Sequence, residues 1–126
     1  MGVYGYDVAH TPHLDSLAAR GVLFENAMAS VPITLPSHAS LLTGQHPPRH
    51  GVRHNGLHRI SDQSKTLAEV LADGGYQTGA VVGAVVLAGE TGLRQGFAHY
   101  DDAGSRLATE ESGFLERPAI EVSDRA

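Results

Sequence analysis

The sequence predicts an α/β fold, and three observations lead to this class. Apolar residues recur at helical spacing in three segments, and glycine follows each of them. A valine-rich run comes after the third segment across a short link, as in αβ units. The apolar residues of that run are nearly continuous, which is typical of a strand covered on both faces.

The first expected element is a helix over residues 12–20. Thr11 followed by Pro12 is typical of an N-cap and a first helical residue. Gly21 is expected to end the helix in the left-handed conformation. Three apolar residues fall on one face of this helix: Leu14, Leu17 and Ala18. Residues 22–28 begin with β-branched and aromatic side chains, so we expect a short strand there.

The second expected helix begins near Pro36 and ends at Gly44. Proline suits a first helical turn, and glycine after the last turn is typical of a helix end. Residues 45–63 hold two prolines, two glycines and few apolar residues, so we expect an irregular loop.

A third helix is expected over residues 64–72. Its expected buried side chains are Leu67, Val70 and Leu71. A strand over residues 76–82 follows the glycine pair that ends the helix. From Asp101 onward the pattern becomes acidic and polar, with a last helix expected after Pro118.

Length, charge and composition exclude several classes of protein. The 126 residues suffice for one domain or part of one, and 41% hydrophobic residues can form a core. Nine basic against fourteen acidic residues give a net charge of -5, with no basic patch for nucleic acid. No apolar stretch approaches the roughly 18 residues of a membrane span, and no leader pattern opens the chain. Without cysteine there is no disulfide and no zinc–thiolate site.

Eight histidines are the most unusual feature of the composition. Four of them are spaced four apart and would form a metal-binding stripe on a helix: His46, His50, His54 and His58. Prolines and glycines lie between them and break such a helix. We therefore interpret the segment as a loop with one or two packed histidines, against the alternative of a metal stripe. We expect no ligand role for His10 or His13, and a surface turn for His99.

Thr34 lies just ahead of the helix expected from Pro36. Free backbone N–H groups and the helix dipole make such a position an anion site. A hydroxyl group there could attack a bound oxyanion if a divalent metal lowered its pKa. The alternative is that Thr34 only caps the helix and Ser37 satisfies its first turn.

A longer string of motifs surrounds Thr34. Residues 34–52 contain Thr-x-Pro-Ser-His, Leu-Leu-Thr-Gly and Pro-Pro-Arg-His-Gly-Val in this order. This string resembles the nucleophile region of sulfatases in the alkaline phosphatase superfamily, and further ordered motifs extend the resemblance over residues 4–102. It implies a mixed, mainly parallel sheet with flanking helices. Residues 1–126 would be an incomplete N-terminal portion of that domain, with the first strand missing.

Three positions depart from the sulfatase pattern. Thr34 stands where formylglycine-forming sulfatases have cysteine or serine, and His38 replaces their arginine. Oxidised threonine would give a ketone, so we expect no formylglycine. Threonine at this position is similar to the nucleophile of nucleotide pyrophosphatase/phosphodiesterases. Residues 79–83 carry no charge where many sulfatases continue into a sulfate-binding Gly-Lys-x-His.

The resemblance implies a metal-dependent hydrolase of small-molecule sulfate or phosphate esters. Thr34 would be the nucleophile and a metal ligand, with Ca, Zn, Mn or Mg as the divalent ion and most ligands outside this chain. Ser37 would present its backbone N–H to the anion. His38 would either hydrogen-bond the anion or pack beneath it. The alternative is a non-catalytic truncated or degenerate paralogue that acts as a folding or interaction unit.

Three further expectations concern the rest of the chain. Gly79 and Gly83 do not form a dinucleotide fingerprint, because that motif needs strand, glycines and helix in this order. The acid pairs Asp101-Asp102 and Glu110-Glu111 are interpreted as solvated surface features. We expect the 126-residue polypeptide alone to be inactive and poorly stable, because most metal ligands would be missing.

Overall fold

The computed structural model describes residues 1–6, 8–103 and 117–126. Its elements in chain order are η1 (Gly2–Tyr4), α1 (Pro12–Arg20), α2 (Thr34–Thr43), α3 (Pro47–His50), α4 (Leu67–Asp73), β1 (Gly79–Val81), η2 (Val85–Leu87), η3 (Gly89–Thr91), β2 (His99–Asp101) and α5 (Ala119–Arg125). The strands β1 and β2 are parallel, with Gly79 opposite His99. Helices combined with a parallel strand pair agree with the predicted α/β class. None of the helices described is long and apolar enough to cross a membrane.

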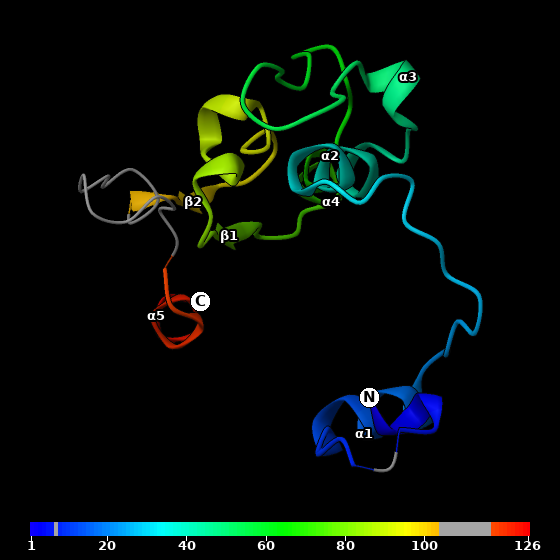
Figure 1. The fold of residues 1–126 in the computed structure, drawn as a ribbon. Helices are drawn as coiled ribbons and strands as arrows, with labels where there is room; N and C mark the ends of the chain where they lie inside the picture. The colour runs from blue at the N-terminus through cyan, green and yellow to red at the C-terminus, as the bar shows by residue number, and fades with distance from the viewer. Residues whose placement is uncertain (7, 104–116) are drawn as a thin grey trace, which may run out of the picture.

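Helix α1 is confirmed with the expected bounds, with Thr11 at its N-cap and Gly21 after its last residue, but the details at both caps differ. The Thr11 hydroxyl does not cap the helix; it accepts from the Gly2 N–H at 3.0 Å and donates to Asp15. Gly21 has φ −122°, so it is extended and not left-handed. These contacts tie η1 to α1, and the two stand apart from the part of the chain that holds α2 and the sheet (Figure 1).

The prediction of a strand over residues 22–28 is wrong. These residues form one turn and otherwise irregular backbone, and they pair with no described strand. Val22, Phe24 and Met28 are exposed, as are Leu14 and Leu17 on α1. A strand needs a hydrogen-bonded neighbour, which β-propensity alone does not supply.

Helix α2 begins two residues earlier than expected, at Thr34. Its end is confirmed, because Gly44 is left-handed with φ 65°. The loop expected over residues 45–63 contains one short helix, α3, that the sequence reading missed. Two prolines start α3, which is where their fixed φ is tolerated.

Helix α4 starts at Leu67, three residues later than expected, behind a capping box. The Thr66 side chain accepts from the Glu69 N–H, and the Glu69 carboxylate accepts from the Thr66 N–H at 2.7 Å. The expected buried face is wrong, because Ala68 is buried whereas the three residues expected there are exposed: Leu67, Val70 and Leu71. The small Ala68 side chain lets the chain at Gly96 approach the helix backbone closely.

The core lies between α2, the loop after α3 and the segment before β2. Its fully buried apolar side chains are Leu35, Ala39, Val52, Ile60 and Leu93. Tyr100 packs against this cluster and donates its hydroxyl to the Leu87 carbonyl at 2.6 Å. Burial, followed by the nearby Asp102 carboxylate, raises the pKa of Tyr100 to about 12.

The strand expected over residues 76–82 is confirmed in part, as β1. The valines that follow it leave the strand and form η2. His99 lies in β2 and not in a surface turn. Both strands are three residues long, and one further hydrogen bond joins the Val82 N–H to the Asp101 carbonyl at 3.0 Å.

The expectation that Asp101 is solvated is wrong. Its carboxylate accepts from the buried Arg117 at 2.7 Å and from Arg125 at 3.2 Å. The Arg117 hydrogen bond, followed by the Ala103 N–H, holds the pKa of this carboxyl well below its usual range.

Helix α5 after Pro118 is confirmed, and its Arg125 forms an ion pair with Asp101 at the end of β2. Asp102 is also engaged, as the acceptor for the Gly89 N–H. The pair Glu110-Glu111 lies outside the described residues.

Candidate functional site

The candidate nucleophile is the first residue of α2. Ile33 is the N-cap in extended conformation, and Thr34 is exposed. The prediction placed Thr34 just before the helix, but the structure places it inside the first turn. Its hydroxyl therefore sits at the positive end of the helix dipole and within reach of solvent.

Two backbone donors of the first turn of α2 are engaged within the chain. The Leu35 N–H donates to the Asn55 Oδ1 at 2.9 Å, and the Ser37 N–H donates to the Ile33 carbonyl at 3.0 Å. Pro36 has no N–H to offer. Because the Ser37 N–H is in use, the group that Ser37 could present to an anion here is its half-buried hydroxyl.

His38 is fixed through the backbone of Thr34. Its Nδ1 lies 2.8 Å from the Thr34 carbonyl oxygen. A carbonyl only accepts, so Nδ1 carries the hydrogen and the neutral ring keeps Nε2 as an acceptor. The ring also borders an apolar cavity of about 160 Å³ with Leu42 and Phe97. His38 thus packs against the sheet side of α2 while it holds the turn that carries Thr34.

Asn55 is the site residue that sequence reasoning missed. It reaches α2 from the loop after α3, 20 residues away from Leu35. Asparagine is among the preferred capping residues, but a capping residue normally lies next to the helix in the sequence, whereas Asn55 belongs to a distant loop. The Asn-Gly pair at 55–56 indicates only a turn.

Replacing Asn55 by alanine is expected to destabilise the protein by about 1 kcal/mol, because the Leu35 N–H loses its acceptor. Asn55→Asp keeps an acceptor at the same place and is the matched variant. Urea unfolding of both variants beside wild type would measure the effect. Equal losses in both would show that the acceptor is not what Asn55 contributes.

His50 is a packed histidine in the segment expected to hold one or two, and that prediction is confirmed. Its side chain is buried, with Nδ1 accepting from the Val52 N–H at 3.1 Å. Nε2 therefore carries the hydrogen and donates to the Ser40 hydroxyl at 3.0 Å. Burial, partly opposed by a backbone hydrogen bond, lowers the pKa of His50 from its ordinary value of 6.5.

The stability of the protein is expected to fall as the pH drops below about 6.5, the ordinary pKa of histidine. Between the folded and unfolded pKa values of His50, the unfolded chain binds more protons. The contribution of His50 to the free energy of unfolding is therefore fully present above that window and is lost as the pH falls through it. Urea unfolding at several pH values would measure this. His50→Gln should flatten the dependence, and the exposed His13→Gln should leave it unchanged.

The other histidines of the spaced set do not gather around an ion. The His54 and His58 rings meet edge to face, with centroids 4.3 Å apart. Within residues 1–6, 8–103 and 117–126 no group of three or more histidines and carboxylates could hold a metal. The Thr34 hydroxyl is a possible ligand for a divalent cation, but the described residues supply no set of supporting ligands beside it. The described residues therefore do not fit a complete metal site.

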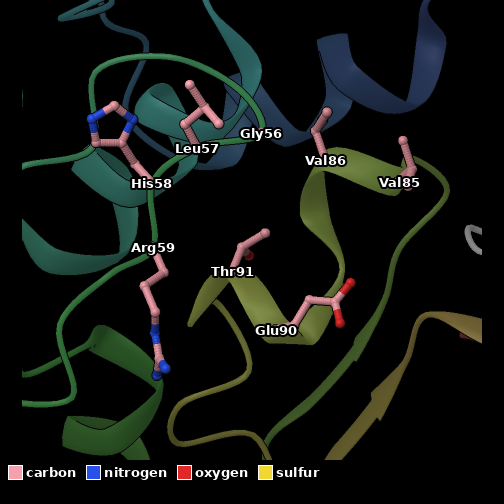
Figure 2. Close-up of a pocket in the computed structure, with 8 residues that line it drawn as sticks. All are labelled: Gly56, Leu57, His58, Arg59, Val85, Val86, Glu90 and Thr91. Atoms are coloured by element: carbon pink, nitrogen blue, oxygen red, sulfur yellow. The ribbon is translucent and has the colours of Figure 1, made fainter.

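A pocket of about 430 Å³ lies between the loop after α3 and the segment that holds η2 and η3. It is lined by Gly56, Leu57, His58, Arg59, Val85, Val86, Glu90 and Thr91. Gly56 follows the capping Asn55 directly, and η2, which carries the two valines, packs against α2. Figure 2 shows Leu57 and His58 on one side and Val85 and Val86 on the other, with Thr91 between them.

Comparison with known proteins identifies the family. The sulfatase family model matches residues 1–111. The chain belongs to the sulfatase family. It is 37% identical over 110 residues to N-sulphoglucosamine sulphohydrolase of Homo sapiens, covering 84% of this chain and 22% of that protein. It is 43% identical over 84 residues to arylsulfatase A of Bos taurus, covering 63% of this chain and 17% of that protein.

A solved sulfatase structure agrees with the fold. A 2-O GAG sulfatase matches with a TM-score of 0.68 at 28% identity, over 87% of this chain and 24% of that one. The resemblance to sulfatases is therefore confirmed, as is membership in a family of enzymes that hydrolyse sulfate esters. The chain spans about a fifth of the length of these curated sulfatases. The threonine nucleophile is not tested by these matches and stays a prediction.

Proposed function

We propose that the full-length protein containing this sequence is a hydrolase of sulfate or phosphate esters that forms a covalent ester on Thr34. The observation that carries the proposal is the position of Thr34: it is exposed, it opens a ten-residue helix, and it begins the Thr-x-Pro-Ser-His string. Family membership supports ester hydrolysis, and the threonine sets this chain apart from sulfatases that use cysteine or serine there.

The reaction would proceed in two displacements. The Thr34 Oγ attacks sulfur or phosphorus, the bond to the alcohol oxygen breaks, and the alcohol leaves with a proton. Water then attacks the same atom, releases sulfate or phosphate and returns the proton to Thr34. A covalent intermediate splits one difficult step into two easier ones. The positive end of the α2 dipole would favour the anionic group throughout.

Two neighbours would hold the nucleophile in place. Asn55 fixes the first turn through the Leu35 N–H, and His38 holds the Thr34 carbonyl from the following turn. Neither contact uses the Thr34 hydroxyl itself. Positioning of this kind matters because displacement requires close alignment of the reacting atoms.

A divalent cation, Ca, Zn, Mn or Mg, would lower the pKa of the Thr34 hydroxyl. The described residues do not gather a ligand set for it, so residues beyond this sequence would supply most ligands. On this view residues 1–126 form an incomplete N-terminal portion of the catalytic domain, and the isolated polypeptide would be inactive. The short matches to much longer sulfatases support that view.

Trapping the intermediate would test the proposal. The full-length protein is incubated with an aryl sulfate, an aryl phosphate and a phosphodiester, quenched in acid and digested. Mass spectrometry is expected to find a sulfo or phospho group on Thr34. Turnover with the group on another residue, or with Thr34 itself oxidised, would contradict it.

The non-catalytic alternative is favoured by the uncharged segment at 79–83 and by His38 in place of arginine. A folding or interaction unit would need no anion-binding residues there. If the full-length protein hydrolyses none of the three esters with each of the four cations added, this alternative replaces the proposal.

A further inference from the structure

The pocket between the loop after α3 and η2 carries an arrangement that the proposed chemistry at Thr34 does not use. We propose that this pocket, lined by Leu57, Val85, Val86 and Glu90, binds the alcohol portion of the ester and selects an apolar group that bears a protonated amine. This inference rests on the proposed function for the identity of the ester. The binding of the organic group does not depend on catalysis.

The location of the pocket suits a leaving group. Its lining begins at Gly56, one residue after the Asn55 that caps α2 beside Thr34. Its opposite wall is η2, which packs against α2. A volume of about 430 Å³ is within the range of small-molecule sites.

Apolar side chains lie on two sides of the pocket, Leu57 on one and Val85 and Val86 on the other (Figure 2). Leu57 is 85% exposed and Val85 is 40% exposed. Exposed apolar side chains that line a concave site are typical of ligand contacts. Binding an aromatic or alkyl group between these walls would remove them from water.

The charge of the lining is set by Glu90. The Arg59 guanidinium is paired with the Asp62 carboxylate at 2.5 Å, and in Figure 2 its side chain extends away from the two valines. Glu90 makes no ion pair with any described residue. The unbalanced charge at the pocket is therefore negative, which favours a cationic group and disfavours a carboxylate.

His58 adds a second polar group at the pocket. Its Nδ1 is buried and has no hydrogen-bond partner. A buried polar atom without a partner is uncommon, but this one has no accessible surface for a ligand to reach. An amine bound between the apolar walls could donate to Glu90.

The test compares three alcohols of equal shape: para-(aminomethyl)benzyl alcohol, para-methylbenzyl alcohol and para-carboxybenzyl alcohol. Their binding to the full-length protein is measured by calorimetry, and the kcat/KM values of their sulfate and phosphate esters are measured alongside. We expect the amine to bind best and the carboxylate worst. Glu90→Gln should reduce the preference for the amine over the methyl compound about fivefold, which corresponds to the free energy of a partly exposed ion pair.

Two matched variants complete the design. Glu25→Gln removes one negative charge from an exposed residue far from the pocket lining and should leave the preference unchanged. Leu57→Ala should weaken the binding of all three alcohols by a similar factor. Because Leu57 is 85% exposed, this substitution should not unfold the protein.

The outcomes separate the two proposals. If the alcohols bind in the expected order but no ester is hydrolysed, the proposed function fails and the pocket assignment stands. If esters are hydrolysed but Glu90→Gln changes the preference no more than Glu25→Gln, the pocket assignment is overturned. Equal binding of all three alcohols to wild type would overturn it as well.

Discussion

Thr34→Ala in the full-length protein is expected to abolish ester hydrolysis, with kcat/KM lower by on the order of 10⁴-fold or more. Alanine leaves no oxygen at the start of α2, so no covalent ester can form there. Thr34→Ser keeps a hydroxyl group and should retain activity. Steady-state kinetics on the ester that wild type hydrolyses best would measure both variants.

The control for this experiment lies on the same helix. Thr43 is at the other end of α2 and donates its hydroxyl to the Ala39 carbonyl. Thr43→Ala should leave kcat/KM within a few fold of wild type, although it also removes a hydroxyl from α2. Since Thr34 is exposed, its replacement should not unfold the protein. Wild-type turnover by Thr34→Ala would remove Thr34 from the mechanism.

Gly96→Ala is expected to destabilise the fold by about 3 kcal/mol or more. Gly96 has φ +82°, where a side chain costs about 1–2 kcal/mol. A Cβ atom there would also lie 2.2 Å from the Glu69 backbone nitrogen and 2.6 Å from the Ala68 carbonyl carbon. These are backbone atoms of α4, so relief of the overlap requires the helix to move.

Gly75→Ala is the matched control for Gly96→Ala. Gly75 has a similar φ of +86°, but nothing lies within 4 Å of the added Cβ. It should therefore show only the conformational cost, about 1–2 kcal/mol. Urea or thermal unfolding of the two variants, measured side by side, isolates the contact with α4. Equal losses would mean that Gly96 does not pack against α4 as the structure describes.

The helices could be predicted from the sequence because their signals are local. Pro12 marks the start of α1, Gly44 marks the end of α2, and α5 follows Pro118 as expected. Each signal acts within one turn of the residue that carries it. The candidate nucleophile was found in the same way, because Thr34 stands in a continuous motif.

The predictions that failed depend on contacts between distant residues. Residues 22–28 have the composition of a strand, but a strand is defined by a partner that composition does not reveal. The acidic pair at 101–102 was interpreted as solvated, yet Arg117, 16 residues later, buries against Asp101. Asn55 was missed for the same reason, because it caps α2 from 20 residues away. The buried face of α4 was wrong because the approach of Gly96 selects a small residue, Ala68, over larger ones.

The parallel pair β1–β2 has a consequence for how this chain behaves outside a larger domain. Each strand is three residues long and pairs on one side with the other, so within the described residues the two outer edges present unpaired N–H and C=O groups. Such edges are templates for strands of other molecules. A polypeptide ending at residue 126 would therefore tend to self-associate as its concentration rises. Further strands paired on either side would cover these backbone groups.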